Sequence, residues 1–288
     1  MKVLLLENIH SEAVRALESR GHEVEVLSSA LDEVELIEAL DGVELLGIRS
    51  RTHITERVLK AHPQLLAVGA FCIGTNQIDL PAAAAAGVAV FNAPYSNTRS
   101  VVELALGEII TLARRLGDRN SSMHAGIWDK SATGSHEVRG RTLGIVGYGN
   151  IGSQLSVLAE GLGMRVYFYD IVDRLALGNA TRVYSLQELF ERCETITLHV
   201  DGRASNAHMI GEKEFSQMRP RTLFLNLCRG NVVDVDALAA ALRSGHIAGA
   251  AVDVFPGEPA SKDEPFVSPL QGIPNVILTP HVLSLIHI

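Results

Sequence analysis

The chain has 288 residues and a formal net charge of −8, and its 25 basic and 33 acidic side chains form no long run of either sign, so neither nucleic acid nor an anionic membrane is an expected partner. An apolar fraction of 47% is enough for sizeable cores, and the length suggests two domains. The cysteines are widely spaced without a C-x-x-C pair, and no apolar run reaches 18 residues, so we expect a cytoplasmic enzyme without disulfides, zinc or membrane spans.

Residues 1–98 alternate short apolar runs with amphipathic patterns. The apolar runs predict strands at Lys2–Leu6, Val24–Leu27, Val43–Ile48, Leu65–Gly69 and Val88–Phe91. The patterns between them predict a helix that Ser11 caps and that stops at Gly21, and further helices at Asp32–Leu40, Glu56–Ala61 and Pro81–Ala86. Such alternation is typical of a parallel sheet with helices on both faces. It predicts a complete small α/β domain in this part of the chain.

An apolar helix over Thr98–Asp118 is expected to link this domain to the next one. The segment Arg119–Arg141 follows, and it carries Trp128 but few periodic signals. Beyond it the alternation resumes. Strands are predicted at Thr142–Val146, Val166–Tyr169, Thr195–His199, Leu223–Leu227, Ala248–Val252 and Val276–Thr279. Helices are predicted from near Ile151 and at Leu186–Glu191, Glu212–Met218 and Asp234–Arg243.

The turn after the strand Thr142–Val146 carries Gly147, Gly149 and Gly152 in G-x-G-x-x-G spacing. The first glycine permits a tight turn, the second lets a pyrophosphate approach the backbone, and the third allows close packing of helix on strand. Asp170 ends the next predicted strand, where a carboxylate can accept hydrogen bonds from an adenosine ribose. The strand, the glycine turn, the helix and the acidic residue follow one another at the spacing of a dinucleotide-binding unit, which favours dinucleotide binding. The acidic residue favours NAD over NADP as the cofactor.

Polar side chains follow three later strands of the same half. Arg229 follows one strand, Asp253 and Glu258 the next, and His281 the last. Open α/β sheets bind ligands beyond the carboxyl ends of their strands, so these groups can converge on one ligand. An arginine can hold a carboxylate bidentately, and a histidine that a glutamate orients can move a proton. Each residue alone could be structural, and His199 is a rival on position because it also ends a strand.

These motifs resemble those of the D-isomer-specific 2-hydroxyacid dehydrogenases. The resemblance rests on LGIVGYGNIG, NLCRGNVVD, AAVDVFPGEP and ILTPH in the second half of the chain. In the first half, IRSRTHIT, FCIGTNQIDL and VFNAPYSNTRSVVELALGE resemble bacterial members that act on a phosphorylated substrate in the serine pathway. The resemblance covers residues 1 to about 281 almost without gaps. It implies two doubly wound parallel-sheet domains, with substrate bound by residues 1–98 and NAD by a Rossmann domain at 99–281.

The resemblance also assigns roles to individual positions. Arg229 would bind the substrate carboxylate and polarise the carbonyl, His281 would be the general acid/base, and Glu258 its partner. The cofactor positions, beyond the three glycines and Asp170 at the ribose, are Asn150 and Ile151 at the pyrophosphate and Leu227, Cys228 and Asp253 near the nicotinamide. The substrate positions are Arg49, Ser50, Arg51, Gly74 and Asn97, of which the two arginines suit a dianionic phosphate.

The resemblance implies NAD-dependent oxidation of 3-phosphoglycerate to 3-phosphooxypyruvate as the expected activity. Two alternatives stay open: another enzyme acting on a 2-hydroxy or 2-oxo acid, and a non-catalytic NAD-responsive binding protein. By resemblance, the chain is expected to form a homodimer or homotetramer through the region 119–141. The family continues after T-P-H with a glycine pair and a long helix that completes the first domain, whereas residues 282–288 form an atypical tail. This departure predicts a truncated chain with poor activity or stability.

Overall fold

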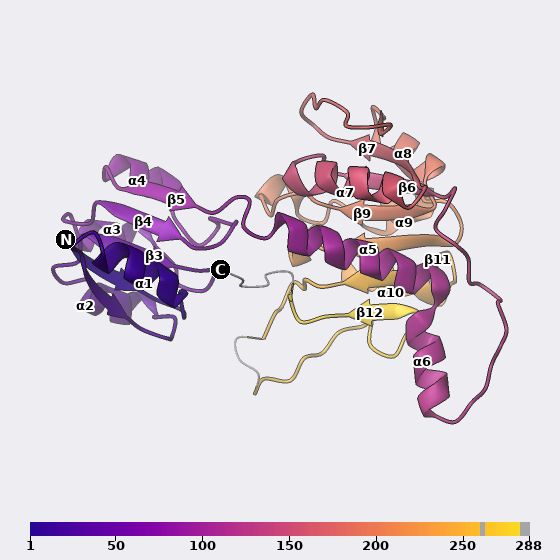
Figure 1. The fold of residues 1–288 in the computed structure, drawn as a ribbon, viewed down its shortest axis with the longest axis horizontal. Helices are drawn as coiled ribbons and strands as arrows, with labels where there is room; N and C mark the ends of the chain where they lie inside the picture. Colours follow the sequence, from indigo (N-terminus) through magenta and orange to yellow (C-terminus); the bar gives the residue numbers. More distant parts are fainter. Residues whose placement is uncertain (260–262, 283–288) are drawn as a thin grey trace. The chain divides into compact units, whose positions relative to one another are not determined.

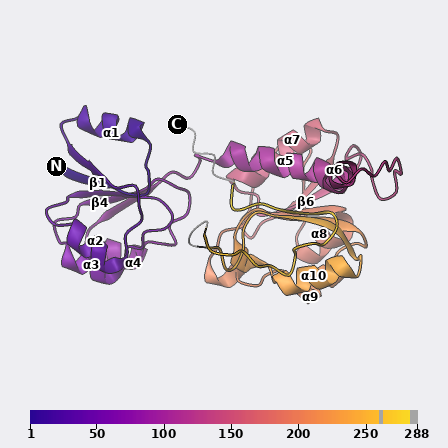
Figure 2. The same cartoon turned by 90° about the horizontal axis from the view of Figure 1, so that it is seen from below.

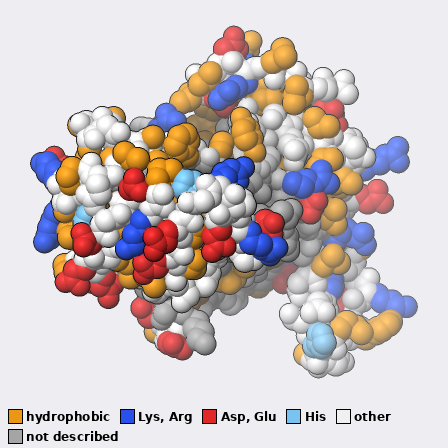
Figure 3. Space-filling view, turned by 60° about the vertical axis from the view of Figure 1, so that its left-hand side comes forward, with side chains coloured by type: hydrophobic (Ala, Val, Ile, Leu, Met, Phe, Trp, Pro, Cys, Tyr) orange, Lys and Arg blue, Asp and Glu red, His pale blue; other side chains and the backbone are white. Residues whose placement is uncertain are grey.

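The computed structural model describes residues 1–259 and 263–282 of the chain (Figure 1). The chain divides into two compact units, the first running from Met1 to Asn97 and the second beginning at Thr98. Each unit is a parallel sheet with helices on both of its faces (Figure 2), which confirms the expected fold class. On the face of the first unit that Figure 3 brings forward, acidic and basic side chains are interspersed with apolar ones.

The first unit contains a five-stranded sheet in the order β2-β1-β3-β4-β5, with every pairing parallel. Its strands are β1 (Lys2–Leu5), β2 (Glu23–Val26), β3 (Leu45–Ile48), β4 (Ala67–Ala70) and β5 (Ala89–Asn92). One face is covered by α1 (Ser11–Glu18), and the other by α2 (Glu33–Ala39), α3 (Glu56–Ala61) and α4 (Leu80–Ala85). The strand order reverses direction between β1 and β3, so the carboxyl ends of these two strands border the crevice where such sheets bind ligands.

Apolar side chains from both sides of this sheet form its core. Leu4, Leu46 and Val68 on the strands are buried against Leu36 of α2 and Val58 of α3. The α2 helix begins with a capping box at Asp32 and Glu35, as its sequence pattern favours. The prediction for α1 was wrong in its cap. His10 is the N-cap residue, its Nδ1 accepts a hydrogen bond from the backbone of Glu12 (3.2 Å), and Ser11 is already helical.

The second unit begins with two helices where the sequence predicted one over Thr98–Asp118. The first, α5, spans Thr98–Arg114, and the second, α6, spans Leu116–His124. Arg115 interrupts them because its φ of 52° lies in the left-handed region. The break is stabilised by tertiary contacts: Nε of Arg115 donates to Asp118 (2.9 Å), whose other oxygen accepts from the backbone of Asn275 (2.9 Å). Long-range contacts that the sequence pattern does not reveal therefore override the local helix propensity.

The seven-stranded sheet of this unit has the order β12-β11-β10-β9-β6-β7-β8, again all parallel. Its strands are β6 (Thr142–Val146), β7 (Arg165–Tyr169), β8 (Thr181–Arg182), β9 (Thr195–Leu198), β10 (Thr222–Asn226), β11 (Ile247–Val252) and β12 (Val276–Leu278). Only the two-residue β8 lacked a predicted counterpart. The order reverses between β6 and β9, which is the dinucleotide-binding arrangement.

Helices cover both faces of this sheet (Figure 2). With α5 on one face lies α7 (Asn150–Gly161), and on the other lie α8 (Leu186–Arg192), α9 (Glu212–Gln217) and α10 (Val235–Arg243). Two short 3-10 turns, η1 (Ala204–Asn206) and η2 (Gly230–Val232), lie in the connections. Each face carries its own buried cluster, centred on Phe168 and on Phe224 respectively. Within the described residues, no helix is both long and apolar enough to cross a membrane.

Candidate active site

The glycine turn between β6 and α7 is fixed by steric constraints at two of its three glycines. Gly147 has a φ of 91°, and a Cβ atom there would lie 2.5 Å from the carbonyl oxygen of His199, at the end of β9. A Cβ atom at Gly152 would lie 2.2 Å from the carbonyl oxygen of Gly147. Gly149 differs, because a Cβ atom there would meet nothing within 4 Å. The first and third glycines therefore serve the fold, and the second leaves an open approach to the backbone.

Asp170, at the end of β7, holds this turn in place. One carboxylate oxygen accepts the backbone N–H of Tyr148 (2.7 Å), and the other accepts that of Val172 (2.8 Å). The Tyr148 ring stacks on Phe168 at 3.7 Å between centroids, and its hydroxyl lies 2.6 Å from Oγ of Ser156. The turn and the acidic residue are thus linked by hydrogen bonds, and the role of Asp170 at the adenosine ribose stays a prediction.

A cavity of about 410 Å³ opens beside this turn. Its lining residues are Tyr148, Gly149, Asn150, Ser153, Arg174, Leu175 and Leu177. In the described part of the chain no side chain caps the N-terminus of α7, so the first backbone N–H groups of the helix, including those of Asn150 and Ile151, remain available to an anion. The open backbone at Gly149, the uncapped helix and the apolar Leu175 and Leu177 fit the pyrophosphate and adenosine of a dinucleotide. The residues present therefore suit NAD.

His281 and Glu258 form a pair beyond the carboxyl ends of β12 and β11. Nδ1 of His281 lies 2.8 Å from Oε2 of Glu258, and the other carboxylate oxygen accepts the backbone N–H of Phe255 (3.2 Å). The hydrogen bond to Glu258 raises the pKa of His281 above its ordinary value despite partial burial. Partial burial raises the pKa of Glu258, but the hydrogen bond and charge of His281 outweigh it and leave the net pKa lowered. The pair favours a carboxylate beside an imidazolium.

Arg229 belongs to the same constellation because the loop after β10 packs on the loop that carries Glu258. A Cβ atom at Gly230 would lie 2.1 Å from the Phe255 carbonyl, so only glycine permits this approach. The charge of Arg229 also lowers the pKa values of both Glu258 and His281. The side chain of Arg229 donates to the carbonyl of Cys228 (2.6 Å) through one nitrogen. An arginine, a carboxylate and a histidine therefore meet at one edge of the sheet.

The other residues expected near the nicotinamide are buried around this edge. Asp253 is fully buried, and its Oδ1 accepts from Oγ1 of Thr279 (2.5 Å) and from the backbone of Val282 (3.0 Å), while its carbonyl accepts from the backbone of His281 (2.9 Å). It therefore holds the segment that carries the histidine. Leu227 and Cys228 are also buried, and burial raises the pKa of the Cys228 thiol to about 11, so that the thiol stays protonated at neutral pH.

His199, the other candidate for the acid/base histidine, lies in a different environment from His281. Nε2 of His199 lies 3.1 Å from Oγ1 of Thr197, and within the described residues its Nδ1 has no hydrogen-bond partner. Desolvation lowers the pKa of His199 to about 4, so the ring is neutral at physiological pH. Among residues 1–259 and 263–282, no carboxylate orients it as Glu258 orients His281. The carbonyl oxygen of His199 instead packs against Gly147 and so constrains the glycine turn.

In the first unit, three of the expected substrate residues, Arg49, Ser50 and Arg51, follow β3 at the carboxyl edge of the sheet. The carboxylate of Glu7, two residues after β1, accepts backbone N–H groups of Arg49 (3.2 Å), Arg51 (3.1 Å) and Thr52 (2.9 Å) after β3. Burial raises the pKa of Glu7, but these hydrogen bonds outweigh it and lower the pKa overall. The R-S-R loop is thus held at the crevice between β1 and β3, with the Ser50 side chain exposed.

Gln77 connects this loop to the second expected segment. Its Nε2 donates to the carbonyl oxygens of Arg49 (2.6 Å) and Gly74 (3.3 Å). Glu7 and Gln77 were not predicted as site residues, because their role depends on contacts between segments far apart in the sequence. Asn97 is the last residue of the first unit. Among the described residues, no group of three or more His, Cys, Asp or Glu side chains is placed to hold a metal ion.

Comparison with known proteins identifies the family. Residues 106–282 match the family described as D-isomer specific 2-hydroxyacid dehydrogenase, NAD binding domain. The chain belongs to this family. The match includes the glycine turn and His281, and it confirms NAD as the cofactor of this dehydrogenase.

The relatives of this 2-hydroxyacid dehydrogenase extend over both units. A D-3-phosphoglycerate dehydrogenase of Haemophilus influenzae is 53% identical over 283 residues, which covers 98% of this chain and 69% of that protein. One from Dictyostelium discoideum is 51% identical over 282 residues, covering 98% and 69% respectively. Among solved structures, the TT0316 protein of Thermus thermophilus has a TM-score of 0.87 at 29% identity and covers 99% of this chain and 90% of that one. A D-lactate dehydrogenase of Aquifex aeolicus, complexed with NAD and lactic acid, has a TM-score of 0.84 at 27% identity, covering 98% and 88%.

Proposed function

We propose that this chain is an NAD-dependent D-3-phosphoglycerate dehydrogenase, which oxidises 3-phospho-D-glycerate to 3-phosphooxypyruvate in the phosphorylated route to L-serine. The observation that carries the chemistry is the His281–Glu258 pair, at 2.8 Å, in the same unit as the glycine turn. Relatives that are 51–53% identical and carry the name D-3-phosphoglycerate dehydrogenase support the choice of substrate. The glycine turn and the uncapped start of α7 would hold NAD, which when bound would supply the acceptor for the hydride from C2 of the substrate.

The protein groups have separate tasks in this oxidation. Nε2 of His281, the ring nitrogen that does not face Glu258, takes the proton of the 2-hydroxyl group. The Glu258 carboxylate orients the ring and stabilises the imidazolium that results. Arg229 binds the substrate carboxylate through its guanidinium group and polarises the C2 oxygen. In the reverse direction, the imidazolium returns the proton to the carbonyl oxygen.

The first unit is proposed to bind the rest of the substrate. Arg49 and Arg51 supply two guanidinium groups for a dianionic phosphate, and Ser50 adds a hydroxyl group. Glu7 and Gln77 support this role because they fix the backbone of the loop and leave it at the crevice of the sheet. Backbone amides at Gly74 and the side-chain amide of Asn97 complete the assignment. Residues 1–98 are thus the substrate domain, and residues 99–281 the NAD-binding domain.

We also propose a cytoplasmic homodimer or homotetramer that pairs through the region 119–141. The exposed apolar side chains Met123, Ile127 and Trp128 support this proposal, since aromatic and Met side chains are enriched at interfaces. Analytical ultracentrifugation of the chain with and without Trp128→Ala tests it. A loss of the dimer in the variant is the expected result, and a monomeric parent chain would contradict the proposal.

A substrate panel tests the proposed activity. NADH formation at alkaline pH is measured with 3-phosphoglycerate, D-lactate and D-glycerate in parallel. The proposal predicts turnover of 3-phosphoglycerate at a kcat/KM far above that of the unphosphorylated acids. Preference for D-lactate or D-glycerate would instead indicate a family member with another 2-hydroxy acid as substrate. Tight NAD binding without turnover of any acid would indicate an NAD-responsive binding protein.

A further inference from the structure

A second cavity, of about 520 Å³, opens at the edge of the seven-stranded sheet opposite the catalytic residues. Arg221 directly precedes β10, and Pro274 lies just before β12, so the cavity borders the amino ends of these strands. Arg229 and His281 follow the carboxyl ends of the same strands. The five residues of β10 separate the two edges by roughly 17 Å, at about 3.3 Å per residue. This cavity is therefore separate from the active site.

The cavity is strongly basic although the chain as a whole carries a charge of −8. Its described lining contains three arginines and no acidic side chain. These lining residues are Arg115, Arg221, Leu242, Arg243, Gly245, Ile247, Ala248, Gln271, Gly272, Ile273 and Pro274. Arg115 forms an ion pair with Asp118 (2.6 Å), and Arg243 donates to the carbonyl of Pro269 (2.8 Å). In the part of the chain that the structure describes, the Arg221 side chain has no hydrogen bond or ion pair.

Two of the guanidinium groups converge on one point. Nη1 of Arg115 and Nη2 of Arg221 lie 3.3 Å and 3.5 Å from the place where a Cβ atom of Gly134 would be. Like charges this close repel one another unless an anion lies between them or water screens them. Asp118 neutralises only Arg115. Both arginines line the cavity, so the arrangement leaves an excess of positive charge at its wall.

The backbone around the cavity is strained as well. Arg115 and Arg221 have φ values of 52° and 67°, and Asn275, next to the lining residue Pro274, has a φ of 56°. Residues with Cβ atoms seldom adopt this left-handed region, and such strain gathers at functional sites. Glycine would satisfy the backbone at Arg221 without strain. The chain instead has an unpaired arginine there, in the position that faces the cavity.

We propose that this cavity binds a small multivalent anion, carrying two or more carboxylate or phosphate groups, on Arg115, Arg221 and Arg243. Guanidinium groups bind both kinds of oxyanion through paired, charge-assisted hydrogen bonds. Arg221 contributes the unpaired charge, and Arg115 can exchange Asp118 for the ligand. The cavity volume of about 520 Å³ suits a molecule of the size of a tricarboxylate.

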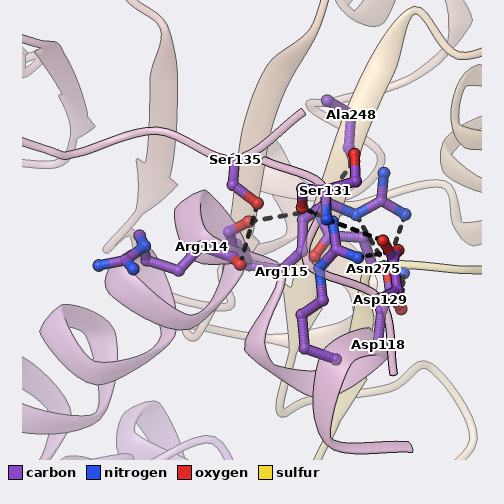
Figure 4. Close-up of polar contacts among 10 residues, drawn as sticks. Arg114, Arg115, Asp118, Asp129, Ser131, Ser135, Ala248 and Asn275 are labelled. Atoms are coloured by element: carbon purple, nitrogen blue, oxygen red, sulfur yellow. Dashed lines mark hydrogen bonds and ion pairs between the residues drawn. The ribbon is translucent and has the colours of Figure 1, made fainter. Parts of the chain in front are cut away.

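The contacts of Arg115 connect this site to the segment that carries His281. Asp118 accepts from Arg115 through Oδ2 and from the backbone of Asn275 through Oδ1, and Nδ2 of Asn275 donates to the carbonyl of Ala248 (3.0 Å), as Figure 4 shows. Asn275 directly precedes β12, and His281 follows that strand. An anion that draws Arg115 away from Asp118 therefore acts on a residue that anchors β12. Occupancy of the cavity should change kcat without competing with NAD.

The test measures citrate and pyrophosphate binding by isothermal titration, at low ionic strength and with saturating NAD, against acetate at matched ionic strength. The key variant is Arg221→Gly, which removes the guanidinium group and also relieves the strained backbone. The matched control is Arg114→Gln, since the side chain of Arg114 points away from the Arg115, Asp118 and Asn275 contacts (Figure 4). Arg243→Ala is a second variant that lies outside the strained positions.

The proposal predicts saturable binding of at least one multivalent anion and none of acetate. Arg221→Gly should melt at the same temperature or higher without anion, yet bind at least 10-fold more weakly, and Arg243→Ala should also weaken binding. Arg114→Gln should change affinity less than 2-fold. Equal affinities in all four chains, or no saturable binding, would overturn the proposal. Dissociation of Arg221→Gly into monomers without any effect of anions would also overturn it, because the arginines would then pair with another copy of the chain.

Discussion

The carboxylate of Glu258 lies 2.8 Å from Nδ1 of His281, and this contact leaves Nε2 of the imidazole to exchange a proton with substrate. The two residues come from the loops after β11 and β12, and two further contacts place them. Gly230 lets the Arg229 loop approach Phe255, and Asp253 binds the backbone of His281. Each of these contacts has a consequence that can be measured.

Glu258→Gln should lower the pKa of His281, because the variant loses the carboxylate that raises it. His281 must be neutral to accept a proton, so the rate of oxidation increases with pH through this pKa. In the variant, the acid limb of kcat/KM for oxidation should shift to lower pH. The maximum should fall by about 10- to 100-fold, since the amide stabilises an imidazolium poorly. A pH–rate profile measures both effects, and an unmoved acid limb would exclude Glu258 as the group that sets the histidine pKa.

Arg229→Lys should reduce kcat/KM for oxidation by about 100-fold, since an ammonium group cannot form two parallel hydrogen bonds to a carboxylate. NAD affinity should fall less than kcat/KM, because the glycine turn after β6, which is expected to hold the pyrophosphate, is separated from β10 by β9. Steady-state kinetics with 3-phosphoglycerate give the loss. The control is Arg192→Lys, at a helix surface pair with Glu188, which should keep more than half of the activity. Similar losses in both variants would mean that the effect is not specific to Arg229.

Substitutions at two glycines of the turn should have different effects, one on cofactor binding and the other on folding stability. Gly149→Ala should leave the melting temperature nearly unchanged, because its Cβ atom meets nothing, yet weaken NAD binding about 10-fold or more where the pyrophosphate must approach. Gly152→Ala should destabilise the chain by about 1–3 kcal/mol, because its Cβ atom would lie 2.2 Å from a carbonyl oxygen. Thermal melts and NAD titrations distinguish these outcomes. Normal NAD affinity in Gly149→Ala would show that the cofactor does not pass over this turn.

Phosphate recognition should depend on the loop that Glu7 orders. Arg51→Gln should lower kcat/KM for 3-phosphoglycerate by roughly 10- to 100-fold, because it removes a charge-assisted hydrogen bond to the phosphate. Turnover of D-glycerate, which has no phosphate, should stay nearly unchanged. Arg57→Gln is the matched control, because Arg57 of α3 pairs with Glu33 of α2 at 2.9 Å. Parallel kinetics on both substrates provide the measurement. Equal losses on the two substrates in Arg51→Gln would place the phosphate elsewhere.

Glu108, on α5, predicts a pH dependence of stability. It is buried, neither of its carboxylate oxygens has a hydrogen-bond partner in the described residues, and burial together with the charge of Asp253 raises its pKa to about 8. The folded chain thus binds a proton that the unfolded chain releases above about pH 4.5. This residue should therefore lower stability as pH rises from 4.5 to 8.

Glu108→Gln removes that titration. Relative to the parent chain, its free energy of unfolding should increase between pH 5 and pH 9, by an amount on the order of 4 kcal/mol. Urea titrations at several pH values measure the difference, with Glu103→Gln, an exposed residue of the same helix, as the control. A difference that does not vary with pH would mean that Glu108 is ionised in the folded chain throughout this range.

Most strands could be predicted because each is a short apolar run between turn residues. Thr142–Val146 was predicted with its exact bounds, and the neighbouring strands differ by one or two residues. The break at Arg115 could not be predicted, since arginine favours helices and the left-handed turn depends on Asp118 and Asn275. Because the sheet is buried on both faces, its strands are apolar runs that can be recognised in the sequence. The break at Arg115 has no such local pattern.

Some residues of the candidate site could also be predicted from the sequence, whereas others could not. Arg229, Glu258 and His281 could be placed together from the sequence because parallel strands bring their carboxyl ends to one edge. Glu7 is the first charged residue after the apolar run Val3–Leu6, and it follows β1 at the point where the strand order reverses. That topology provides the signal, but it requires the order of the strands. The expectations for residues 283–288 lie outside the described residues.

The most direct test of the dehydrogenase assignment is NADH formation from 3-phosphoglycerate by the chain and by His281→Gln, with NAD affinity measured in both. Each is also prepared with the part of the Haemophilus influenzae relative that this chain does not match. The account predicts turnover in at least one form of the parent chain, and a loss of about 1,000-fold or more in the variant with NAD affinity within 2-fold. Turnover that survives in His281→Gln, or its absence from both parent forms, would contradict the account.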